Sequence, residues 1–187
     1  VRELNNHLYK IKNFILLVNH KNYLLFSNAG NGKTHLFCDL VYNARKYNEF
    51  IAILCFGHFL YKKTLQESII TQFDNFNNID ELLSSLDCYA KFKKQIALFL
   101  IDGINEWEYC DRKKIFSEIE LLKNKVNIYS NIRLIISCRE EYRKDIFTDN
   151  ISNDYFLLRH YGFLDNSIDA LYKFCEYYKI EPPATPL

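Results

Sequence analysis

Short, almost continuous apolar runs alternate along this chain with stripes of apolar residues at helical spacing. Five runs have the length of strands: 23–26, 50–56, 96–101, 132–136 and 155–158. Spacings of three and four residues predict helices over 4–18, 33–47, 65–73, 82–90, 115–126 and 168–178. Strands that are apolar on both faces and alternate with helices indicate an α/β fold, in which helices cover both faces of a mainly parallel sheet.

Polar residues directly follow three of the predicted strands. They begin after Phe26, after Ile101 and after Ile136. In parallel sheets of this kind, ligands bind at the carboxyl ends of the strands. We therefore expect the functional residues at these three strand ends.

The residues after Phe26 form a glycine-containing loop between a predicted strand and a predicted helix. Backbone N–H groups in such a loop, together with the positive end of the helix, can hold the phosphates of a nucleotide. Lys33 would reach the β and γ phosphates, and the hydroxyl of Thr34 would bind Mg²⁺. The candidate nucleotide-binding residues are Asn28, Ala29, Gly30, Asn31, Gly32, Lys33, Thr34 and His35.

Three points in this loop leave alternatives open. The usual pattern is G-x-x-x-x-G-K-[ST], and Ser27 stands here in place of its first glycine, at a steric cost wherever φ must be positive. Gly30 and Gly32 alone also suit a simple turn, although such a turn does not need Gly-Lys-Thr at the helix start. His35 also fits a packing or surface role.

A pair of carboxylates follows the third predicted strand. Asp102 would hold the hydration shell of Mg²⁺, and Glu106 would polarise a water molecule for attack on the γ-phosphate. Taken alone, Asp102 and Gly103 are also typical of a turn. Their occurrence together with an intact Gly-Lys-Thr loop favours the catalytic interpretation.

At the end of the fourth predicted strand, the apolar run 132–136 is followed by Ser137, Cys138 and Arg139. If this strand lies between the first and the third, Arg139 points toward the γ-phosphate and could stabilise developing charge. The alternative is an ion pair of Arg139 with Glu140 or Glu141. Cys138 has no evident base beside it in the sequence, which argues against a nucleophilic role.

Composition narrows the classes of function. Lys and Arg total 24 against 23 acidic residues, a net charge of +1, so no strong field attracts nucleic acid or anionic lipid. No apolar run approaches the roughly 20 residues of a membrane helix. Six widely spaced cysteines without a C-x-x-C pair favour reduced thiols in the cytoplasm. Asn127 stands where a guanine-binding [NT]-K-x-D element needs Asp, so adenine is favoured.

Three segments of the chain are similar in sequence to the motifs of a known family: Asn28 to Leu36, Leu100 to Glu106 and Ile135 to Glu140. Together they resemble the nucleotide-binding domain of STAND NTPases of the NACHT type, in particular the prokaryotic antiviral proteins called Avs or AVAST. The resemblance implies a three-layer P-loop NTPase of the ASCE type, with a five-stranded, mostly parallel sheet in the order 5-1-4-3-2. It also implies ATP and Mg²⁺ as ligands. By resemblance, Lys33 and Thr34 are Walker A residues, Asp102 and Glu106 the Walker B pair, and Arg139 the sensor arginine.

In that family the domain is a switch between an N-terminal effector, often a nuclease, and a long C-terminal sensor of viral proteins. ATP binding accompanies assembly into oligomers. The resemblance therefore implies self-association through this domain, a viral protein as trigger, and effector and sensor regions outside this chain. We expect residues 1–20 to lead into the NTPase domain, 21–180 to form it, and the proline-rich 181–187 to begin a junction in a longer polypeptide.

Three functions are compatible with these residues. The first is an ATP-Mg²⁺ binding and slowly hydrolysing switch domain of an antiviral STAND protein. The second is a module that holds nucleotide without meaningful turnover and acts through assembly. The third is an AAA+ type loader or remodeller acting on nucleic acid, against which the near-zero net charge argues.

Overall fold

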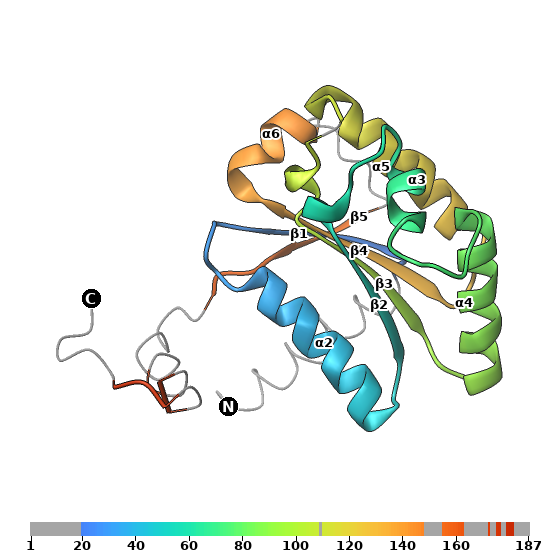
Figure 1. The fold of residues 1–187 in the computed structure, drawn as a ribbon, viewed down its shortest axis with the longest axis horizontal. Coiled ribbons are helices and arrows are strands. Elements are labelled where there is room, and N and C mark those ends of the chain that lie inside the picture. Colours follow the sequence, from blue (N-terminus) through green and yellow to red (C-terminus); the bar gives the residue numbers. More distant parts are fainter. Residues whose placement is uncertain are drawn as a thin grey trace, which may run out of the picture.

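Five parallel strands form the central sheet of the computed structural model (Figure 1). The strands are β1 (Asn22–Ser27), β2 (Ile51–Phe56), β3 (Ala97–Asp102), β4 (Ile132–Arg139) and β5 (Tyr155–Arg159). Their order across the sheet is β2-β3-β4-β1-β5, and every neighbouring pair is parallel. This order confirms the prediction 5-1-4-3-2.

The structure describes residues 20–108, 110–147, 155–162, 172, 175, 176 and 179–181. The helix expected over 4–18 and most of the helix expected over 168–178 lie outside these residues.

Helices cover both faces of the sheet, as Figure 1 shows. The helix α2 (Lys33–Tyr47) lies on one face. The other face carries α3 (Leu65–Ile70), α4 (Ile79–Lys93), α5 (Arg112–Val126) and α6 (Arg143–Ile146). Within the described residues, three short 3₁₀ helices follow strand ends: η1 (Gly57–Phe59), η2 (Ile104–Glu106) and η3 (Glu140–Tyr142).

The alternation of side chains along each strand explains why the strands are apolar at nearly every position. Successive residues of a strand point to opposite faces of the sheet. On β1, Leu24 and Phe26 belong to the large core that includes residues of α4 and α5, whereas Leu25 packs in a separate cluster with Phe37 of α2. Apolar residues are therefore needed on both faces of each inner strand.

The predicted C-terminal ends of β4 and α3 are wrong, and tertiary contacts explain both. β4 does not end at Ile136 but continues to Arg139, because its last residues still pair with β1. α3 ends at Ile70, so Phe73 lies beyond it. The side chain of Gln72 bonds both backbone groups of Phe56 at the edge of the sheet, which fixes the chain just after the helix.

Two neighbouring leucines on α5 provide a test of this packing. Leu122 is 0% exposed and Leu121 is 52% exposed. We expect Leu122→Ala to lower the free energy of unfolding by about 2–5 kcal/mol, because it leaves a cavity in the core. Leu121→Ala should change it by less than about 0.5 kcal/mol. Urea denaturation followed by circular dichroism measures both, and equal losses would contradict this packing.

Candidate functional site

The loop that links β1 to α2 turns on two glycines in the left-handed region. Gly30 has φ 77° and Gly32 has φ 84°. A β-carbon makes this region costly by about 1–2 kcal/mol, which accounts for glycine at both positions. The loop therefore delivers Lys33 and Thr34 to the first turn of α2, at the carboxyl end of the sheet.

The N-terminus of α2 differs from those of α3, α4 and α5 on the other face. At α3, α4 and α5, the side chains of Thr64, Asn78 and Asp111 each accept a hydrogen bond from a backbone N–H of the first turn. At α2 the corresponding residue is Gly32, and the first turn contains no acidic residue. The first N–H groups of α2 are thus left without a side-chain cap, the arrangement that binds phosphate at helix N-termini.

The ammonium group of Lys33 lies against neutral oxygens of the loop. Its Nζ donates to the carbonyl oxygens of Ser27 and Asn28, both at 3.0 Å, and to Ser27 Oγ at 2.8 Å. Burial lowers the pKa of Lys33, and the negative charge of Asp102 partly opposes this. A cation that is partly desolvated and bonded only to neutral atoms interacts strongly with an incoming anion.

Ser27 occupies the position of the usual first glycine without the expected steric cost. It is the last residue of β1, pairs with Arg139 and is 5% exposed. Among the described non-glycine residues, positive φ occurs only at Asn48, Lys94 and Lys179. The backbone at Ser27 therefore needs no glycine, and its side chain adds one oxygen to the contacts of Lys33.

The carboxylate of Asp102, at the end of β3, is bonded to α2 and to β4. Asp102 is 6% exposed. The hydroxyl of Thr34 donates to Asp102 Oδ2 at 2.5 Å, and the hydroxyl of Ser137 donates to Oδ1 at 2.6 Å. The phosphate-type loop and the acidic strand end, far apart in sequence, are therefore in direct contact.

The carboxylate of Glu106 faces the side chains of Arg139 and His58. Arg139 Nη2 donates to Glu106 Oε1 at 2.9 Å, and His58 Nδ1 lies 3.7 Å from Oε2. β4 lies between β1 and β3, as the proposed placement of Arg139 requires. Arg139 forms an ion pair with Glu106 rather than with Glu140 or Glu141, the alternative partners, and Glu140 is bonded to Arg143 and Arg159.

Most of the predicted site residues line one cleft of about 470 Å³. It is lined by Ala29, Gly30, Gly32, Lys33, Thr34, His35, Cys38, Asp102, Gly103, Glu106 and Arg139. Asn28 and Asn31 are not among them; they line a neighbouring hollow of about 190 Å³ with residues of β1 and the end of β5. The side chain of His35 is 75% exposed and lies 3.7 Å from Asp39.

Three residues of the site are absent from the sequence-based assignment of roles. His58 contacts Glu106, Ser137 bonds Asp102, and Asn105 Oδ1 accepts a hydrogen bond from the backbone N–H of Arg139. Each lies at or just beyond the carboxyl end of a strand, or in the turn that follows. That position in the sequence is the signal that marks them.

The oxygen donors of the site fit Mg²⁺. Among the residues that the structure describes, no group of three or more His, Cys, Asp or Glu side chains is placed to hold a metal ion. Thr34 and Asp102 instead offer a hydroxyl and a carboxylate oxygen side by side. Mg²⁺ usually takes one or two such oxygens, together with water and substrate phosphates.

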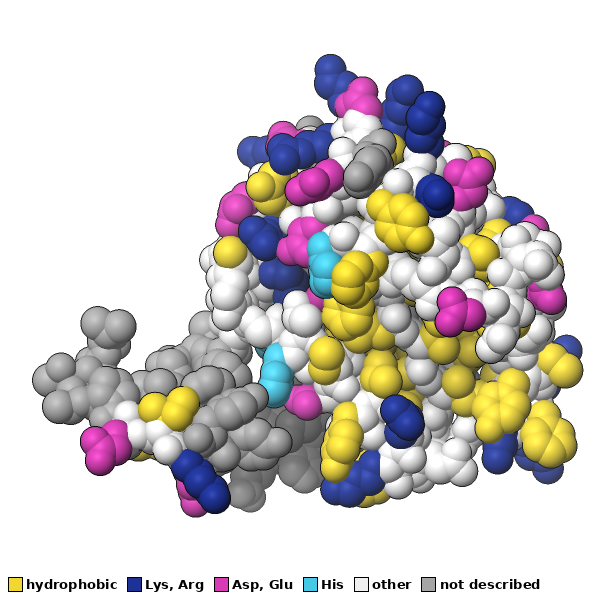
Figure 2. Space-filling model, viewed as in Figure 1, with side chains coloured by type: hydrophobic (Ala, Val, Ile, Leu, Met, Phe, Trp, Pro, Cys, Tyr) yellow, Lys and Arg dark blue, Asp and Glu magenta, His cyan; other side chains and the backbone are white. Residues whose placement is uncertain are grey.

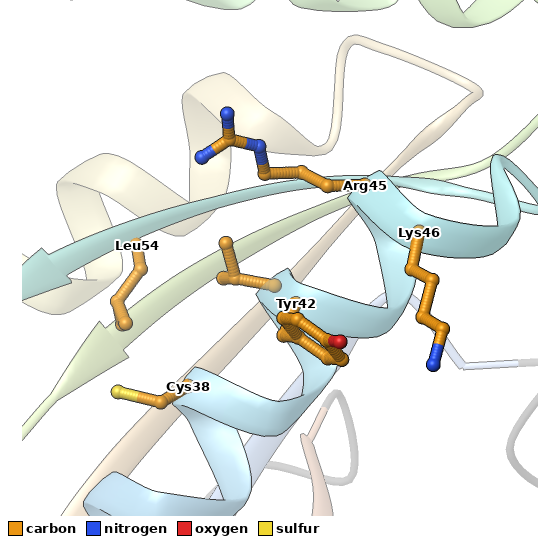
Figure 3. Close-up of a pocket in the computed structure, with 6 residues that line it drawn as sticks. Cys38, Tyr42, Arg45, Lys46 and Leu54 are labelled. Atoms are coloured by element: carbon orange, nitrogen blue, oxygen red, sulfur yellow. The ribbon is translucent and has the colours of Figure 1, made fainter.

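A second hollow, of about 580 Å³, lies between α2 and the edge strand β2 (Figure 3). Its lining residues are Cys38, Val41, Tyr42, Arg45, Lys46 and Leu54. None of them is a carboxylate, so this hollow lacks the ligands of the cleft beside it. On the face drawn in Figure 2, basic and acidic side chains of the described residues are interspersed without one extended basic area.

Comparison with solved structures identifies the fold. A Walker-type ATPase of Pyrococcus abyssi superposes with a TM-score of 0.60 at 17% identity, over 89% of this chain and 56% of that one. AMPPCP-bound DnaA from Aquifex aeolicus superposes with a TM-score of 0.57 at 16% identity, over 96% of this chain and 54% of that one. Domain III of the replication initiation protein DnaA from Thermotoga maritima superposes with a TM-score of 0.53 at 15% identity, over 89% of this chain and 65% of that one. The chain thus spans between half and two thirds of these proteins.

The chain has the fold of a P-loop NTPase of the ASCE type. No family model and no curated protein matches the sequence. Among the described residues, no helix has the length and apolar character needed to span a membrane.

The close approach of Gly57 to Gly103 provides a test of the site's geometry. A β-carbon at Gly57 would lie 1.9 Å from the carbonyl oxygen of Gly103, which also accepts the N–H of Glu106 at 2.8 Å. We expect Gly57→Ala to displace this carbonyl, destabilise the fold by about 1–3 kcal/mol and speed hydrogen exchange at the Glu106 amide.

Gly30→Ala is the matched control, because a β-carbon there meets nothing within 4 Å. The Gly30→Ala variant should lose only the stability that a β-carbon costs at positive φ, and hydrogen exchange at its Glu106 amide should stay unchanged. Native exchange at Glu106 in Gly57→Ala would show that the two turns are not in contact.

Proposed function

We propose that this chain binds ATP together with Mg²⁺ in the cleft and hydrolyses it slowly, as a nucleotide-dependent switch domain. The observation that carries the proposal is the 2.5 Å bond between Thr34 and Asp102, which joins a Gly-Lys-Thr helix start to an acidic strand end. A strand-to-helix turn without a ligand has no need of either residue.

The residues of the loop would bind the phosphates. The uncapped N–H groups of α2 and the ammonium of Lys33 supply hydrogen bonds and positive charge, and Gly30 and Gly32 leave the backbone open to a close approach. Thr34 and Asp102 would hold Mg²⁺. When bound, the ion would neutralise charge on the β and γ phosphates.

Glu106 and Arg139 would act at the γ-phosphate. The Glu106 carboxylate would accept a hydrogen bond from the attacking water, and the guanidinium of Arg139 would stabilise charge that develops on the phosphate. In the structure these two groups are bonded to each other. Catalysis therefore requires that Arg139 exchange this carboxylate for the phosphate, which frees Glu106 Oε1 for water.

The same ion pair favours a second candidate function, a module that holds nucleotide without meaningful turnover. If Arg139 keeps Glu106 when nucleotide is bound, the water-polarising group stays occupied. Purified protein that retains ATP rather than ADP after prolonged incubation with Mg²⁺ would support this function over hydrolysis.

The biological role that we propose is that of an antiviral STAND protein of the NACHT type, with self-association through this domain. Support comes from the amino-acid sequences of the three motif segments around Lys33, Asp102 and Arg139, which resemble those of that family. The proposal places the viral trigger and the effector outside this chain. Loss of protection against virus on Lys33→Ala in the whole protein, at unchanged protein level, tests it.

Two substitutions separate binding from hydrolysis. Lys33→Ala removes the cation at the phosphates, and we expect ATP affinity to fall roughly 10- to 100-fold. Glu106→Gln keeps the size of the side chain but removes its charge, and we expect binding to persist while single-turnover hydrolysis falls roughly 100-fold or more. Titration with a fluorescent ATP analogue and single-turnover assays measure these effects.

Lys46→Ala, at the other end of α2, is the matched control and should leave both quantities unchanged. Wild-type affinity in Lys33→Ala would contradict the binding site. A wild-type hydrolysis rate in Glu106→Gln would contradict only the proposed role of Glu106 and not the binding site.

A further inference from the structure

The hydroxyl of Ser137 is buried between the ends of β3 and β4. Ser137 is 0% exposed. Its hydroxyl donates to Asp102 Oδ1 at 2.6 Å and accepts a hydrogen bond from the backbone N–H of Gly103 at 2.8 Å. A single side chain on β4 therefore bonds two successive residues of β3 and of the turn that follows it.

The first of these bonds fixes the plane of the Asp102 carboxylate. Rotation about the last side-chain bond of an aspartate is soft, so one hydrogen bond leaves the carboxylate free to turn. Here Thr34 holds Oδ2 and Ser137 holds Oδ1. With both oxygens bonded, Oδ2 is kept beside the Thr34 hydroxyl, where the two oxygens can serve one cation.

The second bond fixes the start of the turn that carries Glu106. Gly103 has φ 68°, and its carbonyl oxygen accepts the N–H of Glu106 at 2.8 Å. The N–H of the same residue is held by Ser137. The orientation of the Gly103 backbone, and with it the position of Glu106, therefore depends on a hydroxyl of the neighbouring strand.

We propose that Ser137 is a positioning residue shared by the two carboxylates, Asp102 and Glu106. It sets the orientation in which Asp102 holds Mg²⁺ and anchors the turn that presents Glu106. This inference rests on the proposed function, because it concerns the same cleft. It predicts that the loss of one buried hydroxyl weakens the effect of Mg²⁺ on nucleotide binding.

The neighbouring residue offers a matched control. Cys138 is also buried, at 1% exposed, but its side chain belongs to the core on the other face of the sheet. Its sulfur contacts the carbonyl oxygen of Arg139 at 3.4 Å, and Asp102 and Gly103 are not among its hydrogen-bond partners. Cys138→Ala thus disturbs the same strand without touching either bond of Ser137.

The experiment measures the ATP dissociation constant in Mg²⁺ and in excess chelator for each variant. The ratio of the two constants reports how far Mg²⁺ strengthens binding. We expect Ser137→Ala to reduce this ratio roughly tenfold or more, as for the loss of a hydrogen bond to a charged group, and Cys138→Ala to leave it unchanged. Ser137→Cys keeps a side chain of similar size with a weak donor, so it should also reduce the ratio while preserving the fold.

Two further measurements distinguish positioning from a merely structural effect. Without nucleotide, hydrogen exchange at the Gly103 amide should speed up in Ser137→Ala and stay native in Cys138→Ala. In an Asp102→Asn background, adding Ser137→Ala should change the Mg²⁺ ratio little further, because the metal carboxylate is already lost.

The possible outcomes separate a failure of this inference from a failure of the proposed function. A wild-type Mg²⁺ ratio in folded Ser137→Ala and Ser137→Cys overturns the inference and leaves the proposed function intact. Wild-type protein that binds no ATP, with or without Mg²⁺, overturns the proposed function and this inference with it. An equal loss in Cys138→Ala shows that general damage to β4 is responsible, which also overturns the inference.

Discussion

The contact between Thr34 and Asp102 is the interaction on which the site depends, since it joins residues 68 positions apart at 2.5 Å. The sheet order makes this contact possible. β4 separates β1 from β3, so the helix start after β1 and the acidic end of β3 meet across the end of a single strand. An order with more than one strand between β1 and β3 would place the two motifs at a greater distance, and neither motif has the same chemistry without the other.

Each charged side chain of the cleft has a polar partner in this structure. Lys33 is bonded to neutral loop oxygens, Asp102 to two hydroxyls, and Glu106 to Arg139. Every charged group thus has a partner that a phosphate, a cation or a water molecule can replace. Binding in such a site exchanges partners rather than creating new ones, which limits the cost of keeping ionised groups partly desolvated.

The rule for strand ends was sufficient to predict cleft residues after Phe26, Ile101 and Ile136, whereas the strand order was implied by the resemblance of the three motif segments to a known family. The failures have a common cause. The end of α3, the extension of β4 and the contact of His58 with Glu106 all depend on which segments meet in three dimensions. Ser27 was a different case, because a glycine is needed at that position only if its φ is positive, and a strand residue has negative φ.

The close approach of Gly57 to Gly103 has a consequence for how substitutions at this site are interpreted. Gly57 has no role in the proposed chemistry, yet a side chain there would overlap a backbone atom of the turn that carries Glu106. In a survey of all single substitutions scored by function, Gly57 would therefore be intolerant although it contacts no ligand in the proposed mechanism. Intolerance alone therefore does not distinguish residues that support the turn of Glu106 from the groups that act on the nucleotide, and a measurement of stability is needed to separate the two.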